Sequence, residues 1–407
     1  MRILVISQYY YPENFRINDI CEELAKRGHR VTVLTGLPNY PEGHVPKEYR
    51  HGKKRNETIN GVEVMRCFEI GRRKGSFWRA LNYFSFMLSG MYRALWLSKD
   101  AFDVIYGYAP SPIMQMMAAL IFKKRSGKQV VFYSTDIWPA ALKVGMRSEG
   151  MAFHLINRIS RKIYRGCDWI HVTSMPFIEY IHKMHDIPYE RIAYVPQHAE
   201  DIYLFEDFMP VENNCVDFLF AGNVGMAQDM DCVISACTRL KDMTGWKMHI
   251  VGDGSYLEKT RELVRASGLE EFFVFYGRRP MGEMPDFYRM ADACMVTLKH
   301  ENEIGLTLPS KLQSYMAAGK PVIGAIDGAA QEVIKESNCG VCVAAGDSKA
   351  LACVMQDYIL QPQKYAQCGK NGKAYFNEHF TKEAFMQKLL SALEKAIQAP
   401  LRESIRF

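Results

Sequence analysis

The segment 306–324 carries the clearest chemical signal in the sequence. It places Pro309, Ser310 and Lys311 ahead of an apolar run, followed by a glycine and a β-rich stretch. This order predicts a loop, a short helix that begins near Ser310, and a strand. The backbone amides and positive dipole at a helix start can cradle a diphosphate, and Lys311 would add a full charge. Because every helix has an N-terminus, this signal alone is weak.

The elements that must position such a site follow an alternating α/β pattern. Short β-rich runs alternate with longer helical patterns in both halves, which predicts doubly wound parallel sheets covered by helices. Residues 2–7, 16–27 and 30–35 read as strand, helix and strand. Further strands are expected at 62–67, 103–107, 128–133, 168–173, 191–195, 216–221, 247–251, 272–276, 293–298, 321–326 and 339–343.

A chain of 407 residues is too long for one ordinary core and predicts two domains. The polar segment 206–214 separates two strand-like runs, so we place the boundary there. We expect domains at 1–205 and 206–380, and a C-terminal helix and tail at 381–407 that packs back on the first domain. The carboxyl-edge loops of the two sheets are expected to surround a common ligand cleft.

Composition describes a globular protein, with 48% hydrophobic and 24% charged residues. The eleven cysteines are scattered, as in reduced intracellular proteins, and Cys339 and Cys342 read as strand residues more readily than as a redox or metal pair. The N-terminus enters a strand without signal-peptide features, which favours a cytoplasmic location.

The charge is distributed unevenly along the chain. Residues 1–200 hold 29 Lys and Arg against 18 Asp and Glu, whereas residues 201–407 hold 22 against 27. The basic half should face an anionic partner. Aromatic residues beside the basic runs fit a membrane surface or a phosphorylated lipid at least as well as nucleic acid.

The segment 77–97 is an unusually aromatic helix candidate. Arg79 and Arg93 leave thirteen uncharged residues between them, too few to span a bilayer. The basic run 72–74 precedes it, which suits a helix lying in the membrane interface. A buried domain helix is the equal alternative.

The run 314–323 resembles the donor-site signature of glycosyltransferase family 4, the retaining enzymes of GT-B fold. Segments 220–225, 249–254, 274–278, 327–332 and 339–343 agree with that family in order and spacing, and 22–35 resembles its first unit. The resemblance implies two Rossmann-like domains, the N-terminal one binding an acceptor and the C-terminal one a nucleotide sugar.

A narrower likeness is carried by 38–43, 136–139 and 309–314, which are similar to bacterial enzymes of capsule, O-antigen or exopolysaccharide assembly. This implies transfer of a sugar from a UDP-linked donor to a lipid-linked or polysaccharide acceptor. It also implies a peripheral position on the inner face of the plasma membrane. No cofactor and no metal are expected, and no nucleic acid partner.

The sequence departs from the family at charged positions. Two family glutamates fall at Leu306 and Ser314, and the family's cationic clamp falls at Asn223 and Gln228. Two phosphates need other cations, for which Lys299 and Lys311 are the best candidates. The expected donor-binding residues are Gly222, Asn223, Gly225, Gly252, Arg278, Lys299, Glu301, Ser310, Lys311, Leu312 and Ser314.

Catalytic roles are expected for Asp136, Glu303 and Lys299. Asp136 stands at a strand end, where it would place or deprotonate the acceptor hydroxyl, or else cap a helix. Glu301 and Glu303 could reach the donor sugar, or they are ordinary loop carboxylates. Acceptor contacts are expected from Tyr11, Asn14, Arg16, Asn39 and Tyr40, with a purely structural turn as the alternative for the first loop.

Two other functions fit the same sequence. A sugar-nucleotide epimerase would share the fold and need no acceptor, and a non-catalytic membrane-associated subunit would explain the missing glutamates and the neutral clamp positions. A dinucleotide oxidoreductase is disfavoured because no Gly-x-Gly-x-x-Gly follows the first strand.

Overall fold

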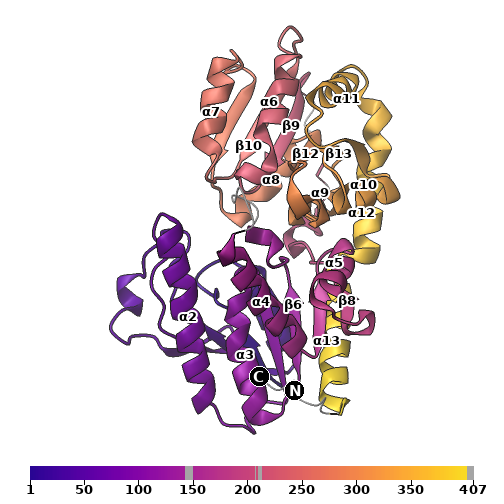
Figure 1. Cartoon of the computed structure of the whole chain (residues 1–407). Helices are drawn as coiled ribbons and strands as arrows, with labels where there is room; N and C mark the ends of the chain where they lie inside the picture. Colours follow the sequence, from indigo (N-terminus) through magenta and orange to yellow (C-terminus); the bar gives the residue numbers. More distant parts are fainter. Residues whose placement is uncertain (143–149, 207, 210–212, 401–407) are drawn as a thin grey trace. The chain divides into compact units, whose positions relative to one another are not determined.

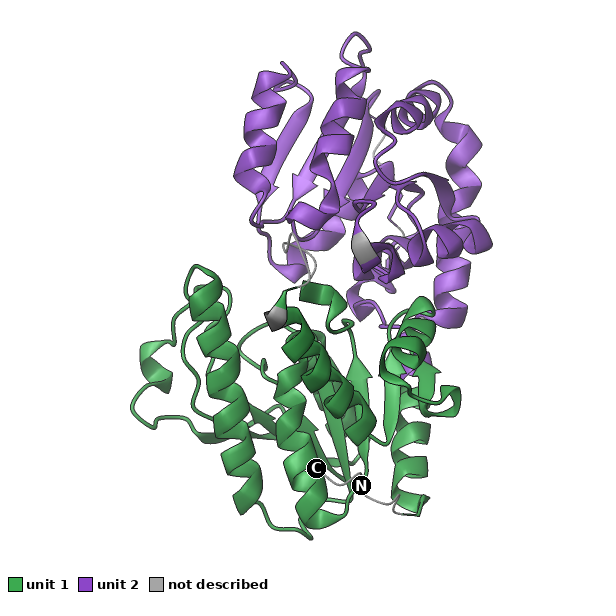
Figure 2. Ribbon diagram, viewed as in Figure 1, with its two compact units in different colours: residues 1–195, 386–407 green, residues 196–385 purple. Residues whose placement is uncertain are grey.

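The computed structural model describes residues 1–142, 150–206, 208–209 and 213–400. The chain forms two compact units (Figure 2). Unit 1 comprises residues 1–195 and the C-terminal segment from 386, and unit 2 comprises residues 196–385. The units divide at 195/196 and 385/386, whereas the sequence places the boundaries at 205/206 and 380/381. Parts of the predicted linker (207 and 210–212) and tail (401–407) lie outside the described residues.

Unit 1 contains a sheet whose strands run in the order β3-β4-β2-β1-β5-β6-β7-β8. Neighbouring strands are parallel except for the antiparallel edge pair β3–β4. The strands are β1 (Arg2–Ile6), β2 (Arg30–Thr35), β3 (Asn56–Ile59), β4 (Val62–Arg66), β5 (Val104–Ala109), β6 (Val130–Ser134), β7 (Trp169–Val172) and β8 (Ile192–Tyr194).

Helices cover the sheet of unit 1 (Figure 1). The central strands are almost continuous buried apolar runs, as expected when both faces of a parallel sheet are covered. The helices are α1 (Arg16–Lys26), α2 (Ser76–Trp96), α3 (Met117–Ser126), α4 (Met151–Gly166), α5 (Pro176–His185) and most of α13 (Lys382–Gln398).

Unit 2 contains a parallel sheet in the order β11-β10-β9-β12-β13-β14. Its strands are β9 (Val216–Ala221), β10 (Trp246–Val251), β11 (Phe273–Gly277), β12 (Ala293–Thr297), β13 (Val322–Ala325) and β14 (Gly340–Val343). Its helices are α6 (Met230–Thr238), α7 (Leu257–Ala266), α8 (Met284–Met290), α9 (Ser310–Ala317), α10 (Ala329–Ser337), α11 (Ser348–Leu360) and α12 (Ala366–His379).

Both units are doubly wound α/β domains, so the predicted fold class is confirmed. Every strand that the sequence predicts is present within a residue or two. The edge strand β3 is not predicted, because its sequence Asn-Glu-Thr-Ile carries no apolar run and alternates between exposed and half-buried positions. Its pairing with β4 defines it as a strand.

Helix α2 is buried on one face and exposed on the other. Asn82, Phe86, Gly90 and Ala94 form the buried face, and a Cβ atom at Gly90 would stand 3.4 Å from the Cβ of Ala118 in α3. The two helices therefore pack closely at this point. Among the helices that the structure describes, none is long and apolar enough to cross a membrane.

Candidate functional site

The sheet order of unit 2 creates a switch point between β9 and β12. From β9 the chain builds outward to β10 and β11, and it then returns to the other side of β9 to build β12, β13 and β14. Ligands of such sheets bind at the carboxyl ends of the two strands where the direction reverses. The loops 222–229 and 298–309, with α9 directly after the second loop, occupy this position.

Two glycine turns pack against each other at this sheet edge. Gly222 and Gly252 have φ angles of +137° and +140°, and a Cβ atom on Gly252 would lie 1.8 Å from the Gly222 carbonyl oxygen. The Val224 amide donates a hydrogen bond to the Asp253 carbonyl (2.9 Å). A Cβ atom on Gly225 would approach the side chains of Asn223 and Gln228 within 3 Å. These close approaches leave no room for a larger residue at Gly252 or Gly225.

Lys311 lies directly beneath the first of these turns. Its Nζ atom is 3.5 Å from the centroid of the Phe220 ring and would be 3.5 Å from a Cβ atom on Gly222. Although part of the residue is exposed, Nζ is buried and has no hydrogen-bond partner among the described residues. Burial lowers the pKa of Lys311 to about 7. A cation held only by an aromatic face is suited to an incoming anion.

The start of α9 is open for hydrogen bonding. Pro309 is the N-cap residue and no side chain caps the helix. The Leu312 amide bonds the Pro309 carbonyl at 3.0 Å, and the amides of Ser310 and Lys311 precede the first intrahelical bond. Ser310 is exposed, whereas the Leu312 side chain is fully buried, so only the backbone of Leu312 belongs to this surface.

Lys299 is held close to the same loops through its backbone. Its amide donates to the Ala227 carbonyl (2.9 Å), which ties the loop after β12 to the loop after β9. Burial raises the pKa of Asp229, and the positive charge of Lys299 acts against that rise. The lysine therefore has an acidic neighbour and does not stand alone.

Sequence reasoning missed one carboxylate at this site. Ser314 donates a hydrogen bond from its hydroxyl to Glu200 (3.3 Å). The segment that carries Glu200 is anchored nearby by Tyr203, which is buried and packs edge-on against the Tyr288 ring with centroids 5.0 Å apart. The signal that could have found Glu200 is the polar turn 196–201, which carries Gln197, His198, Glu200 and Asp201 after a predicted strand.

The remaining donor candidates occupy different places. Asn223 is exposed on the β9 loop, where its amide reaches Gln228 at 3.5 Å. Glu301 is exposed, and Glu303 is half-buried in the short helical segment that follows. Arg278 is exposed after the edge strand β11, two strands from β9. The structure therefore does not bring Arg278 together with Lys311.

The sheet of unit 1 has its own switch point, between β1 and β5. Tyr11 and Asn14 are exposed on the loop after β1, and Arg16 is half-buried at the first position of α1. The loops of the two strands are joined by the Gln8 amide, which donates to the Gln115 side chain (2.7 Å). These acceptor candidates thus lie where a doubly wound sheet offers a ligand site.

Asn39 belongs to a buried polar network. Its amide and that of Tyr40 both donate to one oxygen of Glu13 (2.6 Å each), and its side-chain oxygen accepts from Asn82 of α2 (3.2 Å). Burial raises the pKa of Glu13 to about 7 despite these two hydrogen bonds. Asn39 therefore holds the loop, while Tyr40 is 42% exposed and presents its ring.

Asp136 follows β6, two strands from β1 in the sheet order. Its carboxylate accepts a hydrogen bond from the neighbouring Ile137 amide (3.1 Å), and burial raises its pKa to about 7. The residue is half-buried and does not cap an α-helix. A carboxyl that titrates near neutrality is suited to accept a proton.

The one acidic pair with Asp-x-Asp spacing near the donor loops is Asp229 and Asp231. The Asp231 carboxylate accepts the Tyr256 hydroxyl at 2.9 Å, and Asp229 has the charge of Lys299 close by. Within the described residues, no group of three or more His, Cys, Asp or Glu side chains is arranged to hold a metal ion.

Comparisons with known proteins agree with this architecture. Residues 210–375 match the family model "Glycosyl transferases group 1", and residues 14–198 match "Glycosyl transferase 4-like domain". The chain is 25% identical over 343 residues to WcaI of Escherichia coli K12, named as a glycosyl transferase of colanic acid biosynthesis. That alignment covers 78% of this chain and 82% of WcaI.

Two solved structures share the fold. Sucrose-phosphate synthase from Thermosynechococcus elongatus superposes with a TM-score of 0.78 at 16% identity, over 98% of this chain and all of the other. HepE from Anabaena, solved in complex with UDP and glucose, gives 0.71 at 15% identity, over 97% and 99% of the two chains. Because one half matches the group 1 model, the other half matches the 4-like model, and the whole chain superposes on these structures, this chain is a family-4-like glycosyltransferase of GT-B fold.

Proposed function

We propose that the enzyme transfers a sugar from a UDP-linked donor to an acceptor hydroxyl with retention of the anomeric configuration, without a metal ion. The observation that carries the donor half of the proposal is the buried Lys311 ammonium beneath the Gly222 turn, beside the open start of α9. A departing diphosphate gains negative charge, and amides and a cation already in place stabilise it without reorganisation. The UDP complex of HepE supports UDP as the nucleotide.

The donor is bound by the residues around α9. The amides of Ser310 and Lys311 take the phosphates, and Lys299 supplies a second charge. Ser314 and Glu200 take the ribose, because a carboxylate and a hydroxyl 3.3 Å apart suit a diol. Glu301 and Glu303 follow β12 on the same loop and are assigned to the sugar.

The acceptor is bound by unit 1. Tyr11, Asn14, Arg16 and Tyr40 contact it, and Asn39 acts by holding Tyr40 through Glu13. Asp136 places the attacking hydroxyl and receives its proton. Its raised pKa means that close to neutral pH the carboxyl is partly protonated, so this role requires the ionised fraction.

The acceptor is lipid-linked, and the enzyme works at the inner face of the plasma membrane. Phe84, Leu88, Tyr92 and Leu95, which we call the α2 ridge, line the exposed face of α2 with 43% to 64% of each side chain exposed. They lie opposite the buried face of the helix. An exposed apolar row beside basic residues is typical of interfacial helices.

A binding and product experiment tests the transferase proposal. Calorimetry should detect UDP binding in the presence of EDTA, and a UDP-sugar with a lipid-diphosphate acceptor should give a product whose anomeric configuration NMR reports as retained. Absence of binding by any nucleoside diphosphate would overturn the donor site. A new nucleotide sugar formed from donor alone would identify an epimerase instead.

A further inference from the structure

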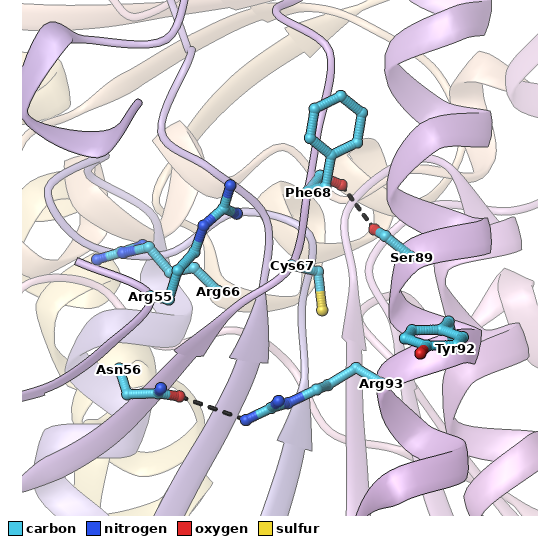
Figure 3. A pocket seen from close by; sticks show the side chains of 8 residues that line it. All are labelled: Arg55, Asn56, Arg66, Cys67, Phe68, Ser89, Tyr92 and Arg93. Atoms are coloured by element: carbon cyan, nitrogen blue, oxygen red, sulfur yellow. Dashed lines mark hydrogen bonds between the residues drawn. The ribbon is translucent and has the colours of Figure 1, made fainter. Parts of the chain in front are cut away.

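Unit 1 has a surface pocket that the proposed chemistry does not use. Its cavity volume is about 260 Å³, and its walls come from the start of β3, the end of β4 with the two residues after it, and the C-terminal half of α2 (Figure 3). Pockets for drug-sized ligands measure about 300–1,000 Å³. The cavity is therefore small for a nucleotide sugar and better matched to a compact polar group.

The pocket is strongly basic. Arg55, Arg66 and Arg93 are among the eight residues that line it, and none of the eight is acidic. Arg66 is neutralised by Glu57, at 2.7 Å. In the described chain Arg55 and Arg93 form no ion pair. Arg93 makes only a long contact to the Asn56 side chain (3.5 Å), drawn in Figure 3.

Both unpaired arginines act electrostatically on Cys67 in the pocket wall. Burial raises the pKa of Cys67 to about 12; the charges of Arg93 and Arg55 oppose that rise, and the charge of Glu69 adds to it. A phosphate accepts paired N–H donors from guanidinium groups, and this cavity is lined by two arginines that have no ion-pair partner among the described residues.

The rim of the pocket is apolar and continues onto the α2 ridge. Tyr92, a member of the ridge, lines the pocket together with Phe68, which is 56% exposed. Ser89 fixes this rim to α2 because its hydroxyl donates to the Phe68 carbonyl (2.6 Å). A molecule with an anionic head and an apolar tail would meet both surfaces at once.

We propose that this pocket binds the phosphate headgroup of an anionic membrane lipid while the α2 ridge contacts the apolar part of the bilayer. The inference rests on the membrane contact in the proposed function and adds a defined headgroup site to it. Because two charges are uncompensated, a phosphomonoester headgroup, with a charge near −1.5 to −2, is preferred over a singly charged diester.

The test is vesicle flotation of the full-length protein. Phosphatidylcholine vesicles containing phosphatidate are compared with vesicles containing phosphatidylserine at the same measured surface potential. We expect at least fivefold tighter binding to phosphatidate, and loss of that preference in the Arg55→Gln/Arg93→Gln variant. Arg79→Gln is the matched control, since it removes one charge from the same helix outside the pocket and should keep the preference.

Thermal melting and sugar transfer to a soluble acceptor should be unchanged in these variants, so a loss of binding reports the site and not folding. If the double variant keeps the preference for phosphatidate, or if Arg79→Gln loses it equally, the headgroup assignment of the pocket is overturned, while the proposed membrane contact is not. If soluble glycerol 3-phosphate binds as tightly as phosphatidate in vesicles and displaces the protein from them, the lipid assignment is overturned. A wild-type protein that binds no vesicle overturns the membrane part of the proposed function as well, without touching the transferase.

Discussion

The folded protein without ligand stabilises the positive charge of Lys311 poorly. Its ammonium rests on the Phe220 ring, and burial alone accounts for the lowered pKa. In the unfolded chain the amine titrates near 10.5, so folding opposes protonation between about pH 7 and 10.5. This residue therefore costs stability at neutral pH, and the cost is relieved as the pH rises through that window. Functional sites commonly carry such a cost.

Replacing Lys311 by Met should separate stability from binding. The melting temperature at pH 7 should not fall, because a buried charge is removed, while UDP affinity should fall about tenfold or more.

The UDP affinity of the wild-type protein should decrease as the pH rises above 7, because bound phosphate favours the charged amine. Calorimetry in two buffers measures the proton uptake. The exposed Lys335→Met variant is the control, and equal affinity in both variants contradicts the assignment.

Glu200 should matter for the nucleoside and not for the phosphates. Glu200→Gln removes the charge that would accept a ribose hydroxyl, and hydrogen bonds to charged groups contribute about 1.5–3 kcal/mol. UDP affinity should fall about tenfold, whereas pyrophosphate affinity should not change. Glu206→Gln, at a carboxylate already paired with Arg289, is the control. Similar losses of affinity for UDP and for pyrophosphate would contradict a contact between Glu200 and the ribose.

Asp136 should give the reaction a pH dependence. Its pKa is raised to about 7, so the ionised form needed to accept a proton is lost as the pH falls through 7. Turnover should drop on the acid side with an apparent pKa near that value. Asp136→Asn should lower turnover about 100-fold and abolish that limb, as for other acid–base residues. A variant with an unchanged profile would leave Asp136 with a structural role.

At the scale of elements, close backbone packing shapes the proposed donor site. The turns after β9 and β10 touch through Gly222 and Gly252, and their contact leaves no room for a side chain. The short helix α9 then begins next to these turns and is held from behind by buried residues such as Tyr315, whose hydroxyl accepts the Ala221 amide (3.0 Å). The proposed phosphate site is therefore built on backbone that is fixed to the sheet edge.

Gly252→Ala should destabilise unit 2. The new Cβ atom would overlap the Gly222 carbonyl, in a backbone conformation with positive φ, and overpacking and strain each cost about 1–3 kcal/mol. Gly268→Ala is the matched control, because its φ is +64° and nothing lies within 4 Å of the added atom. Denaturant melts should show the larger loss for Gly252→Ala. Equal losses would mean that backbone strain alone is responsible.

At the scale of the whole molecule, the uneven charge should govern approach to a surface. The first 200 residues carry the excess of Lys and Arg over Asp and Glu, and the rest carry an excess of acids. Binding to anionic vesicles should weaken severalfold between 10 and 150 mM salt, because the screening length falls from about 30 to about 8 Å. Flotation measures this. Neutral vesicles should show no salt effect, and salt-independent binding to anionic vesicles would contradict an electrostatic approach.

The sequence by itself determined the class of fold and the order of its elements. Strands such as β9 and helix starts such as Ser310 are encoded by local apolar runs and by proline and glycine, which act over a few residues. The start of α9, on which the proposed phosphate site depends, could be predicted for the same reason, since a helix start needs no distant partner.

Only the tertiary structure decided what surrounds each charge. Lys311 lies on Phe220, Glu200 meets Ser314 across 114 positions of sequence, and Asn39 is enclosed by Glu13 and Asn82. The sequence also did not decide whether α2 is buried or exposed, because an aromatic helix has the same sequence pattern in both cases. Burial, pKa and pairing depend on residues brought together from distant parts of the chain, and a local pattern contains no record of them.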